Sequence, residues 1–164
     1  EAEARRAETS GIRVAMLRTG VVLSPAGGML QQVLPLFLAG LGGPVATSGG
    51  ESHDGSPWLS WIGADDIAGA FAHAVLDDGV TGPVNAVAPE PVTAKEFATV
   101  LGRVLRRPAL IPVPEAGPRL LLGEEGRVET VAADQKVLAD RLVSSGYEMR
   151  DPELEGALRH VLGR

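Results

Sequence analysis

The sequence contains no cysteine. This absence excludes disulfide bonds, thiolate zinc sites and cysteine nucleophiles, and it is typical of a reducing compartment, so we expect a cytoplasmic protein. Aromatic residues make up only 4% of the chain, and therefore aliphatic side chains and alanine must fill most of the interior. The 164 residues are enough for one domain with a hydrophobic core and too few for two ordinary domains.

Positive charge is scarce as well. The chain has 15 Lys and Arg against 21 Asp and Glu, a formal net charge of −6, which argues against nucleic acid as a partner. The apolar run at residues 29–41 is interrupted by Gln31, Gln32 and Pro35 and is too short to span a bilayer, so we expect no membrane partner. The three histidines have no further ligands at metal-binding spacing, and we expect no metal site.

One segment is the most informative for function. Residues 12–23 are apolar and β-branched, which predicts a buried β-strand, and they lead into a flexible turn at Gly27 and Gly28. A short charged helix at residues 1–10, ended by Gly11, is expected before this strand. In open α/β sheets ligands bind at the carboxyl ends of the strands, and the end of this strand is therefore the candidate ligand site.

The rest of the chain alternates between predicted strands and helices, which favours an α/β fold with a mainly helical carboxyl-terminal lobe. Thr93 and Glu96 form a capping box at the start of one helix, and Asp65 or Asp66 is expected to cap another. The other expected elements are a helix near residues 30–41, an exposed loop at 46–57, strands at 58–62, 83–88 and 109–113, and helices in most of the tail.

Four blocks of the sequence occur in a familiar order. They are LRTGVVLSPAGG, WLSWIGADDIAGAFAHAVLDD, GPVNAVAPEPVTAKEF and a tail that includes SSGYEMRDPELEGALRHVLG. In this order they resemble the carboxyl-terminal half of the epimerase-family proteins of the extended short-chain dehydrogenase/reductase superfamily, which are related to nucleoside-diphosphate-sugar epimerases and close with a domain of unknown function. The resemblance implies the carboxyl-terminal part of an NAD(P)-binding Rossmann-like fold, with few parallel strands and a mainly helical substrate-binding lobe.

The resemblance also implies how the chain is divided. Residues 1–45 would form the last part of the Rossmann-like domain, with the strand at 12–23 and the nicotinamide-side loop, and residues 46–164 would form the substrate-binding lobe. The dinucleotide-binding half would be absent from this chain, since no glycine-rich phosphate loop precedes residue 12. A parallel strand without its neighbour exposes an edge, so self-association of the chain through this edge is a further expectation.

The loop Thr19-Gly20-Val21-Val22 is expected to bind the cofactor. By resemblance it passes beneath the nicotinamide of NADP or NAD, with NADP preferred, and Val22 contacts the ring through its backbone. Independently of the family, a carboxamide needs backbone donors and acceptors, and small residues at a strand end allow a close approach. The alternative is that Gly20 is only a turn or bulge glycine.

No catalytic residue is predicted in this chain. The Tyr-x-x-x-Lys pair of the superfamily would lie before residue 1, and the tyrosine that is present, Tyr147, is in a different place. We therefore expect the chain alone to be inactive and to have no measurable affinity for a dinucleotide, because recognition of the pyrophosphate is missing.

Six residues are candidates for a substrate site. Arg18 closes a strand that is expected to be buried, so it either pairs with a structural carboxylate or holds an anionic group of the substrate. Gly27 and Gly28 either admit a substrate close to the backbone or only form the mobile start of the next helix. Asn85 is polar within a strand of apolar residues, where it bonds neighbouring backbone or lies near the substrate.

Trp61 and Asp66 complete this set, and each also has two interpretations. Trp61 is either a core residue or a platform beside the cleft. Asp66 is either a helix cap or a match to the Trp-Ile-His-x-x-Asp run of the family, in which Gly63 of this chain replaces the histidine.

Two functions follow from the residues and the resemblance. The first is the substrate-binding half of an NAD(P)-dependent epimerase or oxidoreductase that acts on a nucleotide-sugar-like or other small polar molecule. The second is a non-catalytic NAD(P)-binding or sensor protein of the same fold. In both, the partner is a small molecule.

Overall fold

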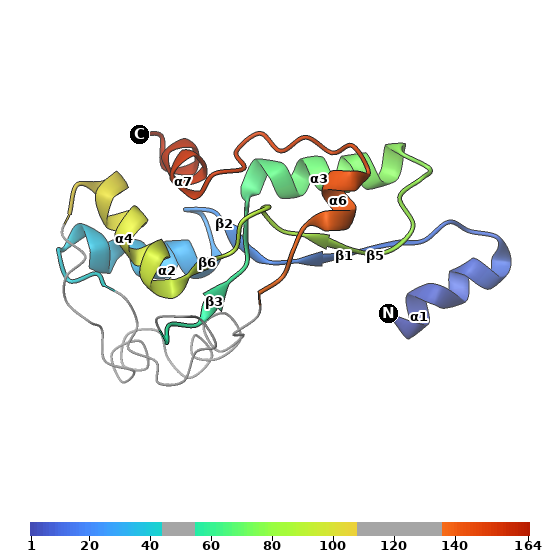
Figure 1. The fold of residues 1–164 in the computed structure, drawn as a ribbon, viewed down its shortest axis with the longest axis horizontal. Helices are drawn as coiled ribbons and strands as arrows, with labels where there is room; N and C mark the ends of the chain where they lie inside the picture. Colours follow the sequence, from blue (N-terminus) through green and yellow to red (C-terminus); the bar gives the residue numbers. More distant parts are fainter. Residues whose placement is uncertain (44–54, 108–135) are drawn as a thin grey trace.

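The computed structural model describes residues 1–43, 55–107 and 136–164 (Figure 1). Its helices are α1 Ala2–Arg5, the 3-10 helix η1 Arg6–Ser10, α2 Gly28–Leu38, α3 Ala64–Leu76, α4 Ala94–Leu105, α6 Asp140–Ser144 and α7 Leu154–Leu162. Its strands are β1 Ala15–Thr19, β2 Val21–Leu23, β3 Trp58–Leu59, β4 Trp61–Gly63, β5 Gly82–Ala86 and β6 Val92–Thr93. The mixture of strands and helices confirms the expected α/β class.

Parallel pairing joins segments that are far apart in the sequence. β1 runs parallel to β5, with Thr19 opposite Ala86, and β2 runs parallel to β4. β3 and β6 form a short antiparallel pair. Because β1 and β5 run in the same direction, their carboxyl ends meet at one edge, which is where parallel sheets present ligand sites.

The strand expected at residues 12–23 is divided at Gly20, and the prediction of one continuous strand is wrong. The N–H of Gly20 donates to the carbonyl of Ala86 (3.2 Å), whereas the N–H of Val21 donates to the carbonyl of Ser60 (2.8 Å). At this residue the chain changes its partner from β5 to the region of β4. A Cβ atom at Gly20 would lie 2.6 Å from the carbonyl oxygen of Ser60, so the close approach of the two backbones requires glycine.

Two other strand limits differ from expectation. The strand expected at residues 58–62 is divided into β3 and β4, because β3 pairs with β6 and β4 pairs with β2. Ile12, expected in a buried strand, is 59% exposed, and β1 begins at Ala15. An apolar pattern indicates an extended segment, but it does not specify where that segment changes partners.

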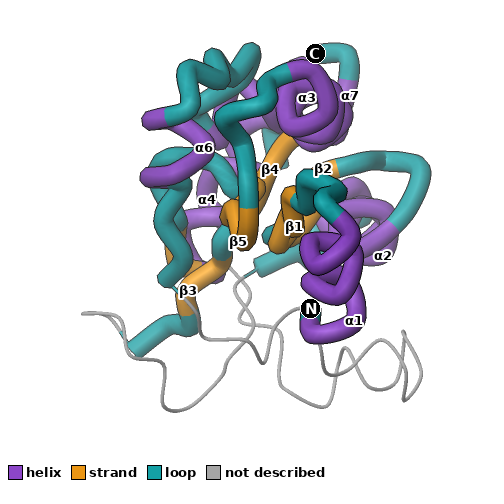
Figure 2. Tube along the Cα trace, turned by 90° about the vertical axis from the view of Figure 1, so that its right-hand side faces the viewer, coloured by secondary structure: helices purple, strands orange, loops and turns teal. Residues whose placement is uncertain are grey.

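Two hydrophobic clusters hold these elements together. One gathers α2, α4 and α7 around Trp61, with Leu30, Leu101 and Leu158 fully buried. The other packs α3 and α6 against β5 through Ile62, Ala70, Val84 and Leu142. Figure 1 shows α2, α4 and α7 at one end of the molecule and α3 and α6 along β1 and β5. In the view turned by 90°, the strands lie between α6 on one side and α2 on the other (Figure 2).

Two of the expected helix-end signals are confirmed. The hydroxyl of Thr93 accepts the N–H of Glu96 (3.2 Å), and the carboxylate of Glu96 accepts the N–H of Thr93 (2.7 Å), which is the capping box. Gly11 ends the 3-10 helix with φ of 75°, in the left-handed region that glycine adopts without strain.

The cap expected at Asp65 or Asp66 is wrong. α3 begins at Ala64, directly after Gly63, and no side chain caps it. The two carboxylates lie instead in the first turn of the helix, where negative charge interacts favourably with the helix dipole.

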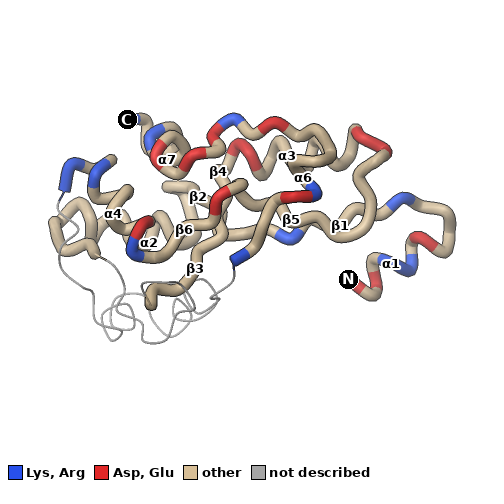
Figure 3. The backbone as a smooth tube through the Cα atoms, viewed as in Figure 1, with Lys and Arg blue, Asp and Glu red and all other residues tan. Residues whose placement is uncertain are grey.

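Charges of both signs lie along the same elements, for example on α1 and α7 (Figure 3). On α7, Arg159 and Glu155 form an ion pair at 2.7 Å one turn apart. Among the described helices, none combines the length and the apolar character needed to cross a bilayer.

Several expectations fall outside the described residues. These are the domain boundary between residues 45 and 46, most of the loop at 46–57 with His53, and the strand at 109–113. The division of the chain into two domains stays a prediction.

Candidate functional site

A pocket of about 780 Å³ opens at the carboxyl ends of β1 and β5. Five parts of the chain line it: the segment around Gly20, the start of α2, the junction between β3 and β4, the end of β5, and a segment that leads into α6. The lining residues are Arg18, Thr19, Gly20, Val21, Val22, Gly28, Met29, Leu59, Ser60, Asn85, Val87, Lys136, Val137 and Leu138. Its position matches the place where open parallel sheets bind ligands.

All four residues expected to bind the cofactor line this pocket. Thr19 ends β1, Gly20 forms the break, and Val21 and Val22 begin β2. The structure combines the two interpretations of Gly20, since this residue both forms the strand break and lines the pocket. The contact of this loop with a nicotinamide stays a prediction.

Arg18 pairs with a carboxylate, as one of its two interpretations expects, and its contact with an anionic group of a substrate stays a prediction. Its Nε and Nη2 atoms donate to the carboxylate of Glu1 at 2.7 and 3.0 Å, and its side chain lines the pocket. The hydrogen bonding between Arg18 and Glu1 lowers the pKa of Glu1 and raises the pKa of Arg18. The side chain of Arg18 is 55% exposed, so the expectation of a buried strand end is wrong here.

The two glycines before Met29 are in different places. Gly28 lines the pocket with φ of 67°, and a Cβ atom added there would lie 3.8 Å from the carbonyl oxygen of Val22. Gly27 is outside the pocket lining and precedes α2 in an extended conformation. Of this pair, only Gly28 lines the pocket.

Asn85 lies on β5 and lines the pocket. Its Nδ2 donates to the carbonyl of Leu138 at 3.1 Å, so the expected bond to backbone is present, although the partner lies far along the chain. The same side chain therefore belongs to the pocket wall and holds another part of that wall.

Trp61 is a core residue, and the structure separates it from the pocket. It is 1% exposed, it is absent from the pocket lining, and its indole N–H donates to the carbonyl of Glu90 at 3.2 Å. Its burial in the cluster of α2, α4 and α7 leaves no ring face for a substrate, so the platform interpretation needs correction.

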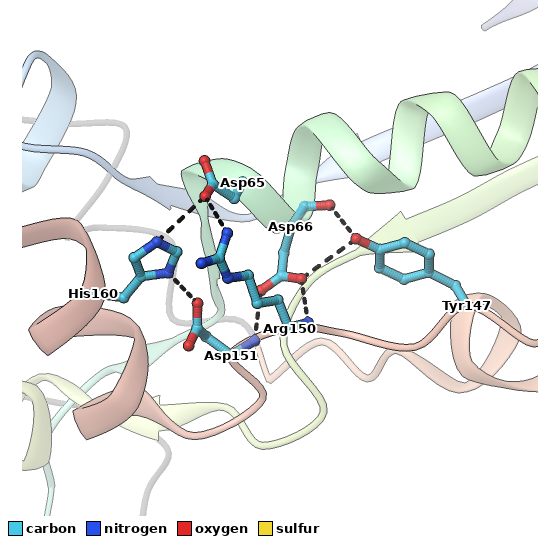
Figure 4. Close-up of polar contacts among 6 residues, drawn as sticks. All are labelled: Asp65, Asp66, Tyr147, Arg150, Asp151 and His160. Carbon is cyan, nitrogen blue, oxygen red and sulfur yellow. Dashed lines mark hydrogen bonds and ion pairs between the residues drawn. The ribbon is translucent and has the colours of Figure 1, made fainter.

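Asp66 is likewise absent from the pocket lining and is 2% exposed. Figure 4 shows its polar contacts. Its carboxylate accepts the backbone N–H groups of Arg150 (2.7 Å) and Asp151 (3.1 Å). A buried carboxylate needs such donors, because an ionised group without hydrogen bonds is costly to bury. Asp66 therefore anchors the segment before α7 to α3, and it lies outside the pocket lining.

Tyr147 also contacts Asp66, and we call Asp66, Tyr147 and the backbone N–H groups of Arg150 and Asp151 the anchor. Its hydroxyl donates to the backbone carbonyl of Asp66 at 2.9 Å. Burial, together with the negative charge and hydrogen bonding of Asp66, raises the pKa of Tyr147 to about 12. A phenol with this pKa and no place in the pocket lining is poorly suited to acid/base work on a ligand there.

The exposed side of the anchor holds further charges (Figure 4). Asp65 pairs with Arg150 (3.1 Å) and lies 3.4 Å from His160, whose other ring nitrogen bonds Asp151. Within the described residues, no group of three or more His, Cys, Asp or Glu side chains is arranged to hold a metal ion.

Seven pocket residues were not predicted from the sequence: Met29, Leu59, Ser60, Val87, Lys136, Val137 and Leu138. Ser60 stands between two tryptophan-containing pairs of apolar residues, and a polar residue there was the one available signal. Nothing in the local pattern indicates that residues 136–138 return to the sheet, because that contact depends on the tertiary fold.

Comparison with known proteins gives three matches of interest and a family model. The model described as "Domain of unknown function (DUF1731)" matches residues 113–161. The epimerase family protein Mb2239 of Mycobacterium bovis is 36% identical over 164 residues, which is 100% of this chain and 52% of the relative. The chain thus spans about half the length of the curated relatives it matches.

Two solved structures resemble the fold. The crystal structure of human epimerase family protein SDR39U1 with NADPH superposes with a TM-score of 0.75 at 36% identity and covers 92% of this chain and 48% of that one. A nucleoside-diphosphate sugar epimerase from Corynebacterium glutamicum has a TM-score of 0.66 at 31% identity, over 96% and 28% of the two chains. These matches confirm the Rossmann-like extended short-chain dehydrogenase/reductase fold, and they show that the chain is similar to epimerase family proteins over about half of their length.

Proposed function

We propose that the pocket is the nicotinamide and substrate side of an NAD(P)-binding site in an epimerase-like or oxidoreductase-like protein. The observation that supports this most is the convergence of residues 19–22, Gly28 and Asn85 on one pocket at the carboxyl ends of two parallel strands. NADP is the preferred cofactor, because the human relative was crystallised with NADPH. The proposed substrate is nucleotide-sugar-like or another small polar molecule, in keeping with the relative from Corynebacterium glutamicum.

The described residues fit one end of a dinucleotide. At Gly20 the backbone lies close to Ser60 and Val87, with no side chain between them. At Gly28 the backbone itself borders the pocket. The sequence has no G-x-G-x-x-G fingerprint to hold the pyrophosphate. That task is assigned to the amino-terminal half that the relatives have. NAD(P), when bound, supplies the hydride chemistry, and this chain would orient the substrate and exclude water.

A second function is supported by what lines the pocket. Among the described lining residues none is Asp, Glu, His or Tyr, so no carboxylate, imidazole or phenol of this part of the chain borders the ligand space. Tyr147 is held by Asp66 instead. This composition favours a non-catalytic NAD(P)-binding or sensor protein, unless the amino-terminal half contributes the acid/base pair.

The test requires a protein in which the amino-terminal half seen in the relatives precedes Glu1, which we call the two-half protein. NADPH and NADH are titrated into it, and a panel of nucleotide sugars is then screened for turnover. Saturable binding with turnover supports the epimerase function, and saturable binding without turnover supports the sensor. If neither NADPH nor NADH binds, both proposed functions are contradicted.

A matched pair of variants locates the site. Thr19→Trp places a large ring in the pocket lining and is expected to weaken NADPH binding at least tenfold, whereas Thr99→Trp places the same ring on the exposed face of α4 and should leave binding unchanged. Equal binding by the wild type and both variants would place the nicotinamide elsewhere.

A further inference from the structure

Residues 136–138 form part of the pocket wall. They lie against the junction of β3 and β4 and against β5, two parts of the chain that are far from them in the sequence. Lys136, Val137 and Leu138 line the pocket, and α6 follows at Asp140. We call these three residues the strap.

Two side chains fasten the backbone of the strap. The hydroxyl oxygen of Ser60 accepts the N–H of Val137 at 3.0 Å. The amide of Asn85 donates to the carbonyl of Leu138 at 3.1 Å. Ser60 comes from the junction of β3 and β4 and Asn85 comes from β5, so the strap is fixed to both parts of the sheet that border the pocket.

The helix that follows the strap is attached to the other end of β5. Arg141 of α6 donates to the carbonyls of Pro83 and of Thr81, the latter at 2.8 Å, and Leu142 is fully buried. From Arg141 back to Leu138, the chain therefore runs from the start of β5 toward its carboxyl end. This path delivers Lys136 to the edge of the sheet where ligands bind.

Among the residues that the structure describes, the side chain of Lys136 contacts an aromatic ring and forms no ion pair with a carboxylate. Its Nζ atom lies 4.4 Å from the centroid of the Trp58 ring. A cation–π contact at an exposed site is weak compared with a charge-assisted hydrogen bond to an anion. Arg18, the other cation of the pocket, is bonded to the carboxylate of Glu1. Lys136 is thus the pocket cation that an anionic ligand can engage without separating an ion pair.

We propose that the strap holds the Lys136 ammonium at the pocket to bind a negatively charged group of the ligand, and that Ser60 and Asn85 are positioning residues for it. Lys136 contacts the ligand, whereas Ser60 and Asn85 act through the strap. The inference rests on the proposed function, because it requires a small-molecule ligand in this pocket. The phosphates of a nucleotide carry the charge that the ammonium would recognise.

Uridine diphosphate is the probe, titrated into the two-half protein with NADPH present at saturation. Lys136→Gln is expected to weaken binding by roughly tenfold, the usual effect of losing about 1.4 kcal/mol, and Lys136→Arg should restore most of it. Lys95→Gln makes the same charge change on α4 and should bind like the wild type. Equal binding by the wild type and Lys136→Gln would overturn the proposal, and so would an absence of binding to the wild type.

The positioning role has its own readout in tryptophan fluorescence. Lys136→Gln removes the cation over Trp58 and should change the emission, and Trp58→Phe should abolish that change. Ser60→Ala and Asn85→Leu should produce the same spectral change and weaken binding of the probe about threefold. Unchanged emission and unchanged binding in both variants would remove Ser60 and Asn85 from the proposal.

The outcomes also separate this inference from the proposed function. If NADPH does not bind, the probe is titrated without it, and a dependence on Lys136 would keep the strap inference while the cofactor proposal falls. If NADPH binds and binding of uridine diphosphate does not depend on Lys136, the cofactor proposal stands and the strap inference is overturned.

Discussion

The hydroxyl of Tyr147 donates to the backbone carbonyl of Asp66 at 2.9 Å, although the two residues are 81 positions apart. The carboxylate of Asp66 at the same time accepts the N–H groups of Arg150 and Asp151 (Figure 4). The carboxyl-terminal segment is therefore tied to the first turn of α3 by one buried aspartate. This arrangement gives a structural role to Asp66, which the sequence leaves open to a place in the substrate site.

The hydroxyl of Tyr147 should lose its proton at a higher pH than an ordinary tyrosine. Its pKa of about 12 lies above the ordinary value of 10.0, first because of burial and second because of the charge of Asp66. The protonated hydroxyl is the favoured form in the folded chain, so the stability it contributes is complete below pH 10 and is lost as the pH rises toward 12. Since the chain has one tyrosine, an ultraviolet absorbance titration reports this group alone.

The control for this titration is the chain unfolded in urea, which should titrate near the ordinary value. Asp66→Asn should move the folded midpoint downward, because the carboxylate charge is removed. A folded midpoint already at the ordinary value would show that the hydroxyl is not held as described.

Loss of the Asp66 carboxylate should destabilise the fold strongly. Asp66→Ala leaves two backbone N–H groups without their acceptor, and each unsatisfied buried donor costs about 1 to 3 kcal/mol. We expect a loss of about 3 kcal/mol in the free energy of unfolding, measured by urea denaturation. Asp65→Ala is the matched control, since its exposed ion pair with Arg150 contributes about 1 kcal/mol or less. Similar losses in both variants would contradict the anchor.

Gly20 should not tolerate a methyl group. Gly20→Ala brings a Cβ atom to 2.6 Å from the carbonyl oxygen of Ser60 and to 2.8 Å from Val87, and such overpacking costs about 1 to 3 kcal/mol. Gly27→Ala is the control, because its φ is extended and nothing lies within 4 Å of the added atom. Equal urea midpoints for the two variants would show that the backbones are further apart at Gly20.

The capping box of α4 should contribute measurably. Thr93→Ala removes the oxygen that accepts the N–H of Glu96, and the expected cost is about 1 kcal/mol in the free energy of unfolding. Thr93→Ser keeps that oxygen and should retain most of the stability. A Thr93→Ala variant with wild-type stability would mean that water replaces the cap.

Local signals made part of the structure predictable. The capping box at Thr93 and the left-handed Gly11 depend on neighbours within a few residues, and both are confirmed. The division at Gly20 depends on Ser60 and Ala86, which sequence spacing does not bring together. The apolar pattern of residues 12–23 therefore predicts an extended segment. The residue at which this segment changes its partner strand is set by the tertiary fold.

The same reasoning explains the candidate site. The loop at residues 19–22 was expected at a ligand site because of the family resemblance and because it has small residues near the end of a predicted strand, and it lines the pocket. Val137 and Leu138 could not be predicted there, because Val137 bonds a residue 77 positions away and Leu138 bonds one 53 positions away. Trp61 and Asp66 were plausible by residue type, but burial excludes them from the pocket.

The position of the nicotinamide is tested most directly by NMR of the isotope-labelled two-half protein during an NADPH titration. The account predicts that the backbone amide signals of Gly20, Val21 and Val22 shift in a saturable way, while those of Leu101 and Leu158 in the core stay in place. Saturable NADPH binding that leaves the signals of residues 20–22 unmoved would contradict it.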